Sequence, residues 1–259
     1  DADGDLDLFV VNYLNWSSNI EQDCYGSAFF VTYCGPTVYQ VPAMDRLYRN
    51  NGDGSFTDVT NAAGIGVAFG NGLGTISADF NGDGVLDLLA VDHDGFTVLD
   101  PEGSRVLTRA DVAGITTALP LTLDPASGPA IVAANTTGVW LWSPGTGRHP
   151  FMAVEASGRS ESDQMRSNAS GIGTNVRVRV AGQWTVFDTI DSHSGPGQSL
   201  APFSIGLHGR TRADFVALQW SDGVTQTEIG LAVGVLHDLT ETQRQLASCP
   251  VLFAWDGEQ

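Results

Sequence analysis

The sequence contains an acidic turn that runs directly into a strand-like apolar segment, and this unit occurs twice. Residues 1–11 align with residues 81–91, at an offset of 80 positions. A third copy at residues 124–134 keeps the apolar segment but has Pro, Ala, Ser and Gly where the acidic residues would lie. This repeat constrains the fold strongly, because each copy is one structural unit that must bury its apolar face against the next.

Each apolar segment is followed by a tight turn and a second strand-like segment, as in residues 90–99 and 134–142. Asp-Gly and Asn-rich turns between β-branched residues are strong hairpin signals. Repeated hairpins with Gly-rich corners predict an all-β fold of propeller blades. At roughly 40–50 residues a blade, residues 1–157 supply about three blades, fewer than the four that closure needs. We therefore expect a partial β-propeller, with the remaining blades in an N-terminal part that precedes Asp1.

The composition changes at residues 158–170 to a polar run that is typical of a linker or a domain entry. Segments in which apolar and polar residues alternate then reappear between residues 171 and 240. A period of two predicts strands with one buried and one solvated face. We expect blades over residues 1–157, a small all-β domain over 158–247, and the start of a further module at 248–259.

The charge of the chain narrows the classes of partner. The 259 residues include 30 acidic and 12 cationic side chains, for a formal net charge of −18. Binding to nucleic acid is driven by cationic side chains, so nucleic acid is excluded as the natural partner. A cationic protein or a glycan suits this charge better. No apolar stretch reaches the roughly eighteen residues that a membrane span requires, so no span is predicted in this chain.

Residues 79–87 carry the most specific motif, with acidic or amide side chains at alternate positions. Calcium prefers six to eight oxygen ligands, which alternate side chains of a tight loop can direct to one point. The expected ligands are the side chains of Asp79, Asn81, Asp83 and Asp87 and the main-chain carbonyl of Val85. Gly84 lies where the chain must bend sharply. An EF-hand is disfavoured, because Ala90 stands where it needs Glu; the other interpretation is an acidic hairpin without metal.

The two other acidic segments match the motif less well. The first loop would bind calcium through the side chains of Asp1, Asp3 and Asp7 and the carbonyl of Asp5, but its first ligand would lie upstream of the sequence. Residues 50–56 resemble a third loop, although Arg49 and Thr57 stand where the motif needs Asp. We interpret this segment as a hairpin turn.

The remaining chemistry-bearing residues predict a disulfide and no catalytic site. Cys24 and Cys34 bracket a Tyr- and Phe-rich insertion, and we expect a disulfide there, with buried free thiols as the alternative. Cys249 lacks a partner in this chain, and the cysteine spacing argues against zinc. His193 lies near Ser and Asp residues in a Gly/Pro/Ser-rich loop, but closeness in sequence does not create a triad. We expect Trp140 and Trp142 to pack within a blade rather than to form a sugar platform.

The motifs together resemble a known family. Residues 33–65, which include Asn50-Asn51-Gly-Asp53-Gly54, and the segment 79–84 resemble FG-GAP/VCBS propeller repeats. Residues 167–180, 194–198, 205–207 and 220–223 resemble an ASPIC/UnbV domain. In this order, the two modules resemble the cartilage acidic protein family and its bacterial relatives.

The resemblance implies a calcium-binding adhesion or protein-interaction module that is secreted, periplasmic or on the cell surface, with no catalysis. Its partner would be a protein or a glycan. The alternative is a polysaccharide-active hydrolase or lyase on a propeller scaffold. Such an enzyme would need carboxylates or histidines that converge in a cleft away from the calcium loops.

Overall fold

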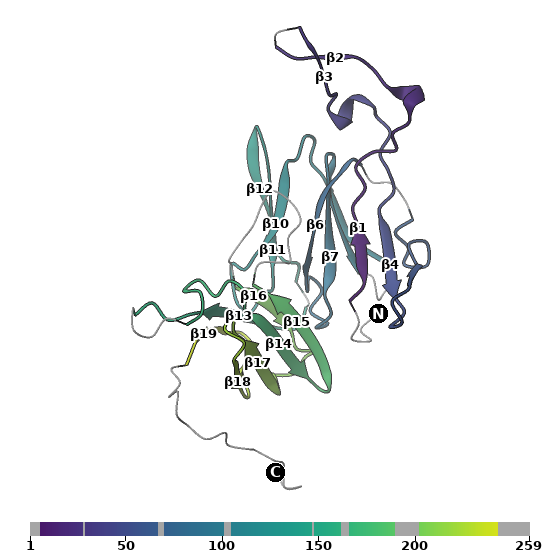
Figure 1. Cartoon of the computed structure of the whole chain (residues 1–259). Helices are drawn as coiled ribbons and strands as arrows, with labels where there is room; N and C mark the ends of the chain where they lie inside the picture. Colours follow the sequence, from purple (N-terminus) through teal and green to yellow (C-terminus); the bar gives the residue numbers. More distant parts are fainter. Residues whose placement is uncertain are drawn as a thin grey trace.

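The computed structural model describes residues 6–27, 29–66, 70–100, 105–146, 148–161, 166–189 and 202–242. Within these ranges the chain is all-β, with two 3₁₀ helices, Ser18–Ile20 and Pro36–Val38, and no α-helix. None of these helices is long and apolar enough to cross a membrane. The strands form several small sheets (Figure 1), and the described sheets do not close into a ring.

Three sheets in the first half of the chain correspond to three propeller blades. The first blade contains β1 (Leu8–Val10), β4 (Arg46–Asn50) and β5 (Phe56–Asp58). The second contains β6 (Gly72–Ala78), β7 (Asp87–Asp92), β8 (Gly95–Asp100) and β9 (Arg105–Asp111). The third contains β10 (Thr117–Leu121), β11 (Ala130–Asn135) and β12 (Gly138–Trp142). Every pairing within these sheets is antiparallel, which confirms the predicted hairpins and the partial propeller.

The blades pack through two apolar clusters. One cluster joins the first and second blades and includes Leu47, Ile65 and Leu99. The other joins the second and third blades, where the ring of Phe96 meets the edge of Trp142 at a centroid distance of 4.8 Å. Trp142 therefore packs between two blades rather than within one, whereas Trp140 is 36% exposed.

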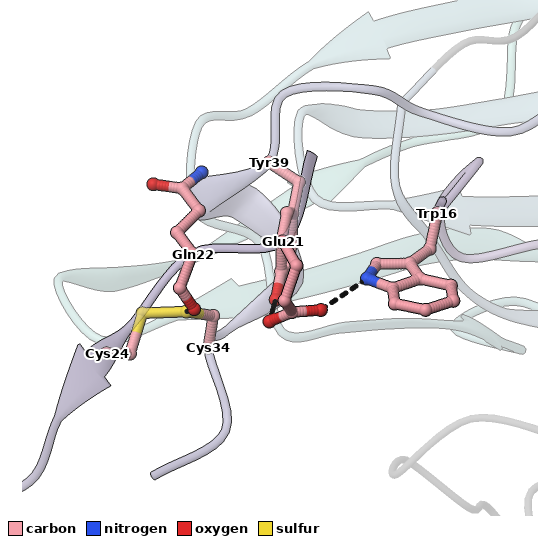
Figure 2. Close-up of a disulfide and its surroundings, with 6 residues drawn as sticks. All are labelled: Trp16, Glu21, Gln22, Cys24, Cys34 and Tyr39. Atoms are coloured by element: carbon pink, nitrogen blue, oxygen red, sulfur yellow. Dashed lines mark hydrogen bonds between the residues drawn. A yellow bond between two sulfur atoms is a disulfide. The ribbon is translucent and has the colours of Figure 1, made fainter. Parts of the chain in front are cut away.

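An insertion between β1 and β4 extends from the first blade (Figure 1). It contains the short strands β2 (Cys24–Tyr25) and β3 (Val31–Thr32), and a disulfide joins Cys24 to Cys34. Figure 2 shows that Trp16 Nε1 and the Tyr39 hydroxyl both donate hydrogen bonds to the Glu21 carboxylate, at 2.6 and 3.0 Å. These two bonds lower the pKa of Glu21.

The second half of the chain forms a unit of two sheets. One sheet has the order β16-β13-β19, from β13 (Phe151–Ser157), β16 (Phe203–Gly206) and β19 (Leu236–Thr240). The other has the order β15-β14-β17-β18, from β14 (Asn175–Val180), β15 (Gln183–Asp188), β17 (Phe215–Gln219) and β18 (Thr225–Glu228). Alternate residues Val176, Val178 and Val180 enter the core, whereas Arg177 and Arg179 are exposed. The predicted period of two is confirmed in this strand.

The predicted boundary at residue 157 requires a correction. Phe151–Ser157, which we assigned to the blades, pairs with β16 and, in parallel, with β19. Met152 and Val154 of this strand belong to the core of the two-sheet unit. That unit therefore begins at Phe151, because Met152, Val154 and Ala156 of this strand are buried in its core, whereas the Phe151 ring packs at the junction with the blades.

The two-sheet unit lies against one end of the blades, next to the turns that lead into β7 and β11 (Figure 1). Phe151 is fully buried at this junction, and its backbone N–H donates a hydrogen bond to the carbonyl of Ala126 at 3.0 Å. Thr122 Oγ1 donates to the carbonyl of Pro202 at 2.7 Å. Blades and two-sheet unit thus meet through polar contacts as well as through a buried aromatic ring.

Candidate functional site

The predicted calcium-binding segment, residues 79–87, connects β6 to β7 in the second blade, and we call it the acidic loop. Asp79 is fully buried and Asp87 is 2% exposed. A β6–β7 connection that carries two buried carboxylates is unusual, because charged side chains are rarely buried without partners. The partners of these two groups therefore decide what the loop can do.

The Asp79 carboxylate accepts three hydrogen bonds from backbone N–H groups. Oδ1 accepts from Gly82 at 2.7 Å, and Oδ2 accepts from Gly84 at 3.0 Å. The third donor is Gly206 of β16, at 2.7 Å from Oδ2. One carboxylate thus holds its own loop closed and also binds a strand of the two-sheet unit, 127 residues away in sequence.

The other loop side chains converge on Asn81. Asp87 Oδ2 accepts hydrogen bonds from the backbone N–H groups of Phe80 and Asn81, at 2.8 and 3.2 Å. Asn81 Nδ2 lies 2.8 Å from Asp83 Oδ2 and 3.4 Å from Asp87 Oδ1. The amide of Asn81 therefore stands between two carboxylates. Asn81 Oδ1 and Asp83 Oδ1 also accept from backbone N–H groups two residues further along the chain.

Glycines allow the two-sheet unit to approach the acidic loop closely. A Cβ on Gly206 would lie 2.2 Å from the carbonyl oxygen of Gly82. Gly84 has a φ of +74°, and a Cβ there would lie 2.7 Å from His208 Nε2. The sharp bend predicted at Gly84 is confirmed. The Thr185 hydroxyl donates a hydrogen bond to the carbonyl of Gly84, so β15 also contacts the loop.

Burial dominates the electrostatics of this loop. Desolvation raises the pKa of Asp79 to about 6, although three backbone N–H donors oppose it. It raises the pKa of Asp87 to about 8, with further repulsion from Asp79, Asp83 and Asp100. The charge of Asp83 disfavours ionisation of both Asp79 and Asp87, because the low dielectric around them strengthens the repulsion. A cation in the loop would relieve this cost.

Arg148 is a nearby cation, on the segment between β12 and β13. Its guanidinium donates hydrogen bonds to the carbonyl oxygens of Phe80 and Ser127, the second at 2.8 Å. Arg148 lies near enough to Asp79 to interact with its charge, although within the described part of the chain the two side chains form no direct ion pair. It therefore bridges the second and third blades mainly through main-chain carbonyls.

The donor set of the acidic loop fits calcium in its chemistry. Four side chains offer carboxylate or amide oxygens, and Val85 offers a carbonyl, so every donor is a hard oxygen. Across the described residues, however, no three His, Cys, Asp or Glu side chains stand together as metal ligands. In this geometry the carboxylates of Asp79 and Asp87 are directed to backbone N–H groups. Coordination would require the Asn81 amide to present to the ion its oxygen, which here accepts a hydrogen bond from the backbone N–H of Asp83, instead of its nitrogen.

The other predicted ligands are placed only in part. Asp1, Asp3 and Asp5 lie outside the described residues. Asp7 Oδ1 accepts a hydrogen bond from the backbone N–H of Asn50 at 2.9 Å. Residues 50–56 form the predicted hairpin between β4 and β5. Its turn is closed locally, since Asp53 Oδ1 accepts from both the N–H and the hydroxyl of Ser55.

The predicted disulfide between Cys24 and Cys34 is present. Cys249 and His193 lie outside the described residues, so the pairing of the first and the role of the second stay predictions. His149 and His208 are exposed residues at the junction, where a Cβ on Gly209 would lie 3.0 Å from the His149 ring. His208 lies over the acidic loop at Gly84, a contact that the sequence does not indicate.

The contacts from the two-sheet unit are what sequence reasoning missed. Gly206 lies in the segment Ile205-Gly206-Leu207, one of the segments that resemble an ASPIC/UnbV domain. A glycine between two buried apolar residues of a strand signals close approach of another backbone. That signal was present, although nothing in the sequence indicates the acidic loop as the neighbour.

Comparison with known families agrees with this architecture. Residues 1–90 match the FG-GAP-like repeat, and residues 164–246 match the ASPIC and UnbV domain. None of the curated proteins matches the chain. Blades followed by this domain define a repeat-containing protein-interaction module. More specifically, the chain is an FG-GAP repeat protein that carries an ASPIC/UnbV domain, which confirms the predicted resemblance.

Proposed function

We propose that this chain is a non-catalytic, calcium-stabilised module that binds a protein or glycan partner outside the cytoplasm. The observation that carries the proposal is the acidic loop itself. Its five oxygen donors lie within nine residues, and the loop is enclosed between the second blade and the ASPIC/UnbV domain. This set of ligands matches calcium and does not match zinc, which prefers nitrogen and sulfur.

The role of calcium would be structural. Side chains of Asp79, Asn81, Asp83 and Asp87 and the Val85 carbonyl would fill most of the coordination shell, and water would complete it. The ion would neutralise carboxylates that are now buried together. Because the Gly206 N–H bonds to Asp79, a loop held by calcium would also fix the docking surface for the ASPIC/UnbV domain.

An extracellular or envelope location is supported by the insertion. The Cys24–Cys34 disulfide closes a segment with highly exposed aromatic rings: Tyr25, Phe29 and Tyr33 are 62%, 88% and 99% exposed. Disulfides persist in oxidising compartments and are rare in the cytosol. Exposed aromatic residues on a disulfide-closed loop also suit adhesion, since aromatic side chains are enriched at interfaces.

A polysaccharide-active enzyme is the alternative function. It would need carboxylates or histidines that converge in a cleft. The described cleft between the second and third blades has a volume of about 420 Å³ and is lined mainly by apolar residues, with Arg148 as its charged side chain. No carboxylate or histidine is among its lining residues. This composition supports a binding function over hydrolysis.

Calcium titration tests the proposal. Calcium should raise the melting temperature of the chelator-treated protein, because an ion that binds only the folded loop stabilises it, by about 2.7 kcal/mol at 100 times Kd. Asp83→Ala should abolish the shift, whereas the matched change Asp124→Ala in the third repeat should keep it. An unaltered shift in Asp83→Ala would contradict the calcium assignment.

A substrate screen tests the absence of catalysis separately. The purified chain should turn over no glycoside, ester or peptide substrate. Turnover that survives Asp83→Ala but disappears with His193→Ala would refute the binding-module proposal and favour the enzyme.

A further inference from the structure

The third blade has three strands, whereas the second blade has four. In the second blade β9 pairs with the outer edge of β8. The third blade ends at β12, whose outer edge has no partner strand within the described residues. β8 is the third strand of the second blade, and β12 is the third strand of the third blade. Because Phe96 of β8 packs on Trp142 of β12, these two strands lie opposite each other. The position opposite β9 therefore corresponds to a fourth strand of the third blade.

The edge of β12 offers backbone groups for pairing. A two-residue turn joins β11 to β12, so Asn135 and Gly138 form its closing pair. In an antiparallel hairpin alternate residues bond across the ladder. Trp140 and Trp142 thus bond to β11, and the N–H and C=O groups of Val139 and Leu141 point to the free edge.

This edge lacks the features that normally block strand addition. Proteins protect exposed edges with charged residues, Pro or bulges. β12 has the sequence Gly-Val-Trp-Leu-Trp, without a charge or a Pro. Val139 and Leu141 are 71% and 52% exposed. A strand that is apolar, regular and open is suited to pair with another chain.

An apolar cleft lies beside this edge. Its volume is about 420 Å³, and it is lined by aromatic and aliphatic side chains of both blades, among them Phe80, Phe96, Leu107, Ile131 and Trp142. Leu107 belongs to β9, on the face that packs toward the third blade. A strand added to β12 would therefore direct every second side chain into the cleft, because side chains alternate across a strand.

The cleft also selects for charge. Arg148 is the only charged residue among its described lining residues. In the described part of the chain its guanidinium donates to the main-chain carbonyls of Phe80 and Ser127 and to no carboxylate, so no carboxylate bound to it balances its charge. A carboxylate can accept hydrogen bonds from a guanidinium and balance its charge. The occupant is thus expected to carry an acidic group at the Arg148 end.

We propose that the β12 edge and the adjoining cleft bind an extended peptide strand of a partner protein. The peptide completes the third blade, inserts alternate apolar side chains, and places a carboxylate near Arg148. This mode is β-strand addition, in which main-chain bonds give affinity and side-chain pockets give specificity. The proposal deepens the proposed binding function and rests on it, but it does not require calcium.

Hydrogen exchange with defined peptides tests the proposal. The probe is a ten-residue peptide of alternating Val and Thr that ends in Glu, with a second version ending in an amidated Gln and a third N-methylated at alternate residues. The first peptide should slow exchange at the amides of Val139 and Leu141. The N-methylated peptide should not bind, because it cannot form the ladder. Equal binding of that peptide, or no protection at these amides at millimolar concentration, would overturn the proposal.

Two substitutions separate backbone pairing from charge. Leu141→Pro removes an edge N–H but no bond to β11, so it should weaken binding while the melting temperature stays near that of Leu141→Thr. Arg148→Gln should weaken the Glu peptide about tenfold and leave the Gln peptide unchanged. If Arg148→Gln unfolds the chain, the affinity ratio of the two peptides in the unaltered protein decides the same point. A ratio of one contradicts the role of Arg148.

Two controls distinguish the remaining outcomes. Binding should persist in chelator, so a failure of the calcium assignment leaves this proposal standing. Light scattering without peptide should show a monomer over the concentrations used. If the chain associates with itself and Leu141→Pro abolishes this association, the strand that pairs with β12 belongs to a second copy of the chain. That outcome would overturn the assignment of a partner peptide.

Discussion

The acidic loop and the equivalent turn of the third repeat, residues 124–130, share a place in the fold but differ in how they hold charge. Each leads into the second strand of its blade, β7 or β11, and each has a glycine with positive φ that packs against the ring of Phe151. A Cβ would lie 3.1 Å from this ring at Gly82 and 2.6 Å at Gly128. A glycine thus packs on Phe151 in both segments, although the two glycines do not align in sequence, whereas only the acidic loop has acidic residues throughout.

The two carboxylates at the start of these segments have opposite environments. Asp79 is buried, and desolvation raises its pKa to about 6. Asp124 is exposed, and hydrogen bonds from the Ser127 hydroxyl and the Ala126 N–H lower its pKa. The third-repeat turn is therefore satisfied by local donors, while the acidic loop has surplus negative charge that a cation can balance. The third repeat therefore lacks the acidic side chains of the loop but still forms the same antiparallel strands.

The largest expected effect comes from Phe151, whose ring contacts both segments. Phe151→Ala should destabilise the protein by about 3–5 kcal/mol, because it empties a fully buried site under two glycine turns. Chemical denaturation followed by fluorescence measures this loss. The control Phe56→Ala removes a side chain that is 49% exposed and should cost far less. Equal losses in the two variants would show that the common contact does not support the junction.

A smaller effect should separate the two segments. Gly206→Ala forces a Cβ toward the Gly82 carbonyl and should cost about 1–3 kcal/mol, as overpacking does. It should also reduce the calcium-dependent rise in melting temperature, since Gly206 N–H bonds to Asp79. Gly35→Ala is the matched control, because a Cβ there meets nothing within 4 Å. A calcium response unchanged by Gly206→Ala would argue that docking and the loop are independent.

The pH dependence in chelator should distinguish the carboxylates. The folded pKa values of Asp79 and Asp87 lie near 6 and 8, above the ordinary value of 3.8. At a pH between the unfolded pKa of about 4 and the folded pKa values, the folded protein holds more protons than the unfolded chain. The free energy of unfolding should therefore fall as the pH rises from about 4 to about 8. Asp79→Asn should flatten this decline in thermal melts at a series of pH values. Stability that instead rises over this range would contradict burial as the dominant cause.

The third-repeat turn should behave in the opposite way. Because the folded pKa of Asp124 is lowered, its contribution is present above the unfolded pKa and is lost as the pH falls through the folded pKa. Asp124→Asn should therefore leave the decline between about pH 4 and pH 8 in place. The same series of melts provides this comparison.

The smallest effect is expected far from both segments. Cys24→Ser with Cys34→Ser opens the insertion, which packs mainly on itself through the short strands β2 and β3. The main unfolding transition and its calcium response should change little, while proteolysis within residues 25–33 should become faster. A large fall in the melting temperature would show that the insertion supports the first blade.

Sequence patterns predicted most of the strands, but they did not predict which segments of the blades contact the two-sheet unit. The alternation in β14 and the turns after β7 and β11 are local signals, which act within a few residues. The calcium-type motif of residues 79–87 is local as well. By contrast, the Asp79–Gly206 bond joins residues 127 positions apart, and no periodicity encodes such a pairing. Similarly, the apolar run of β13 could pack against the blades or against the strands that follow it, and only the observed packing assigns it to the two-sheet unit.

The placement of β13 has a mechanical consequence. This strand enters the two-sheet unit at Phe151 and runs parallel to β19, which ends at Thr240. Tension applied between the blades and the chain after Thr240 pulls the two neighbouring strands lengthwise in opposite directions. The inter-strand hydrogen bonds are then loaded in shear, together, rather than opened one after another. The two-sheet unit is therefore expected to resist extension along the line that joins its attachment to the blades with Thr240.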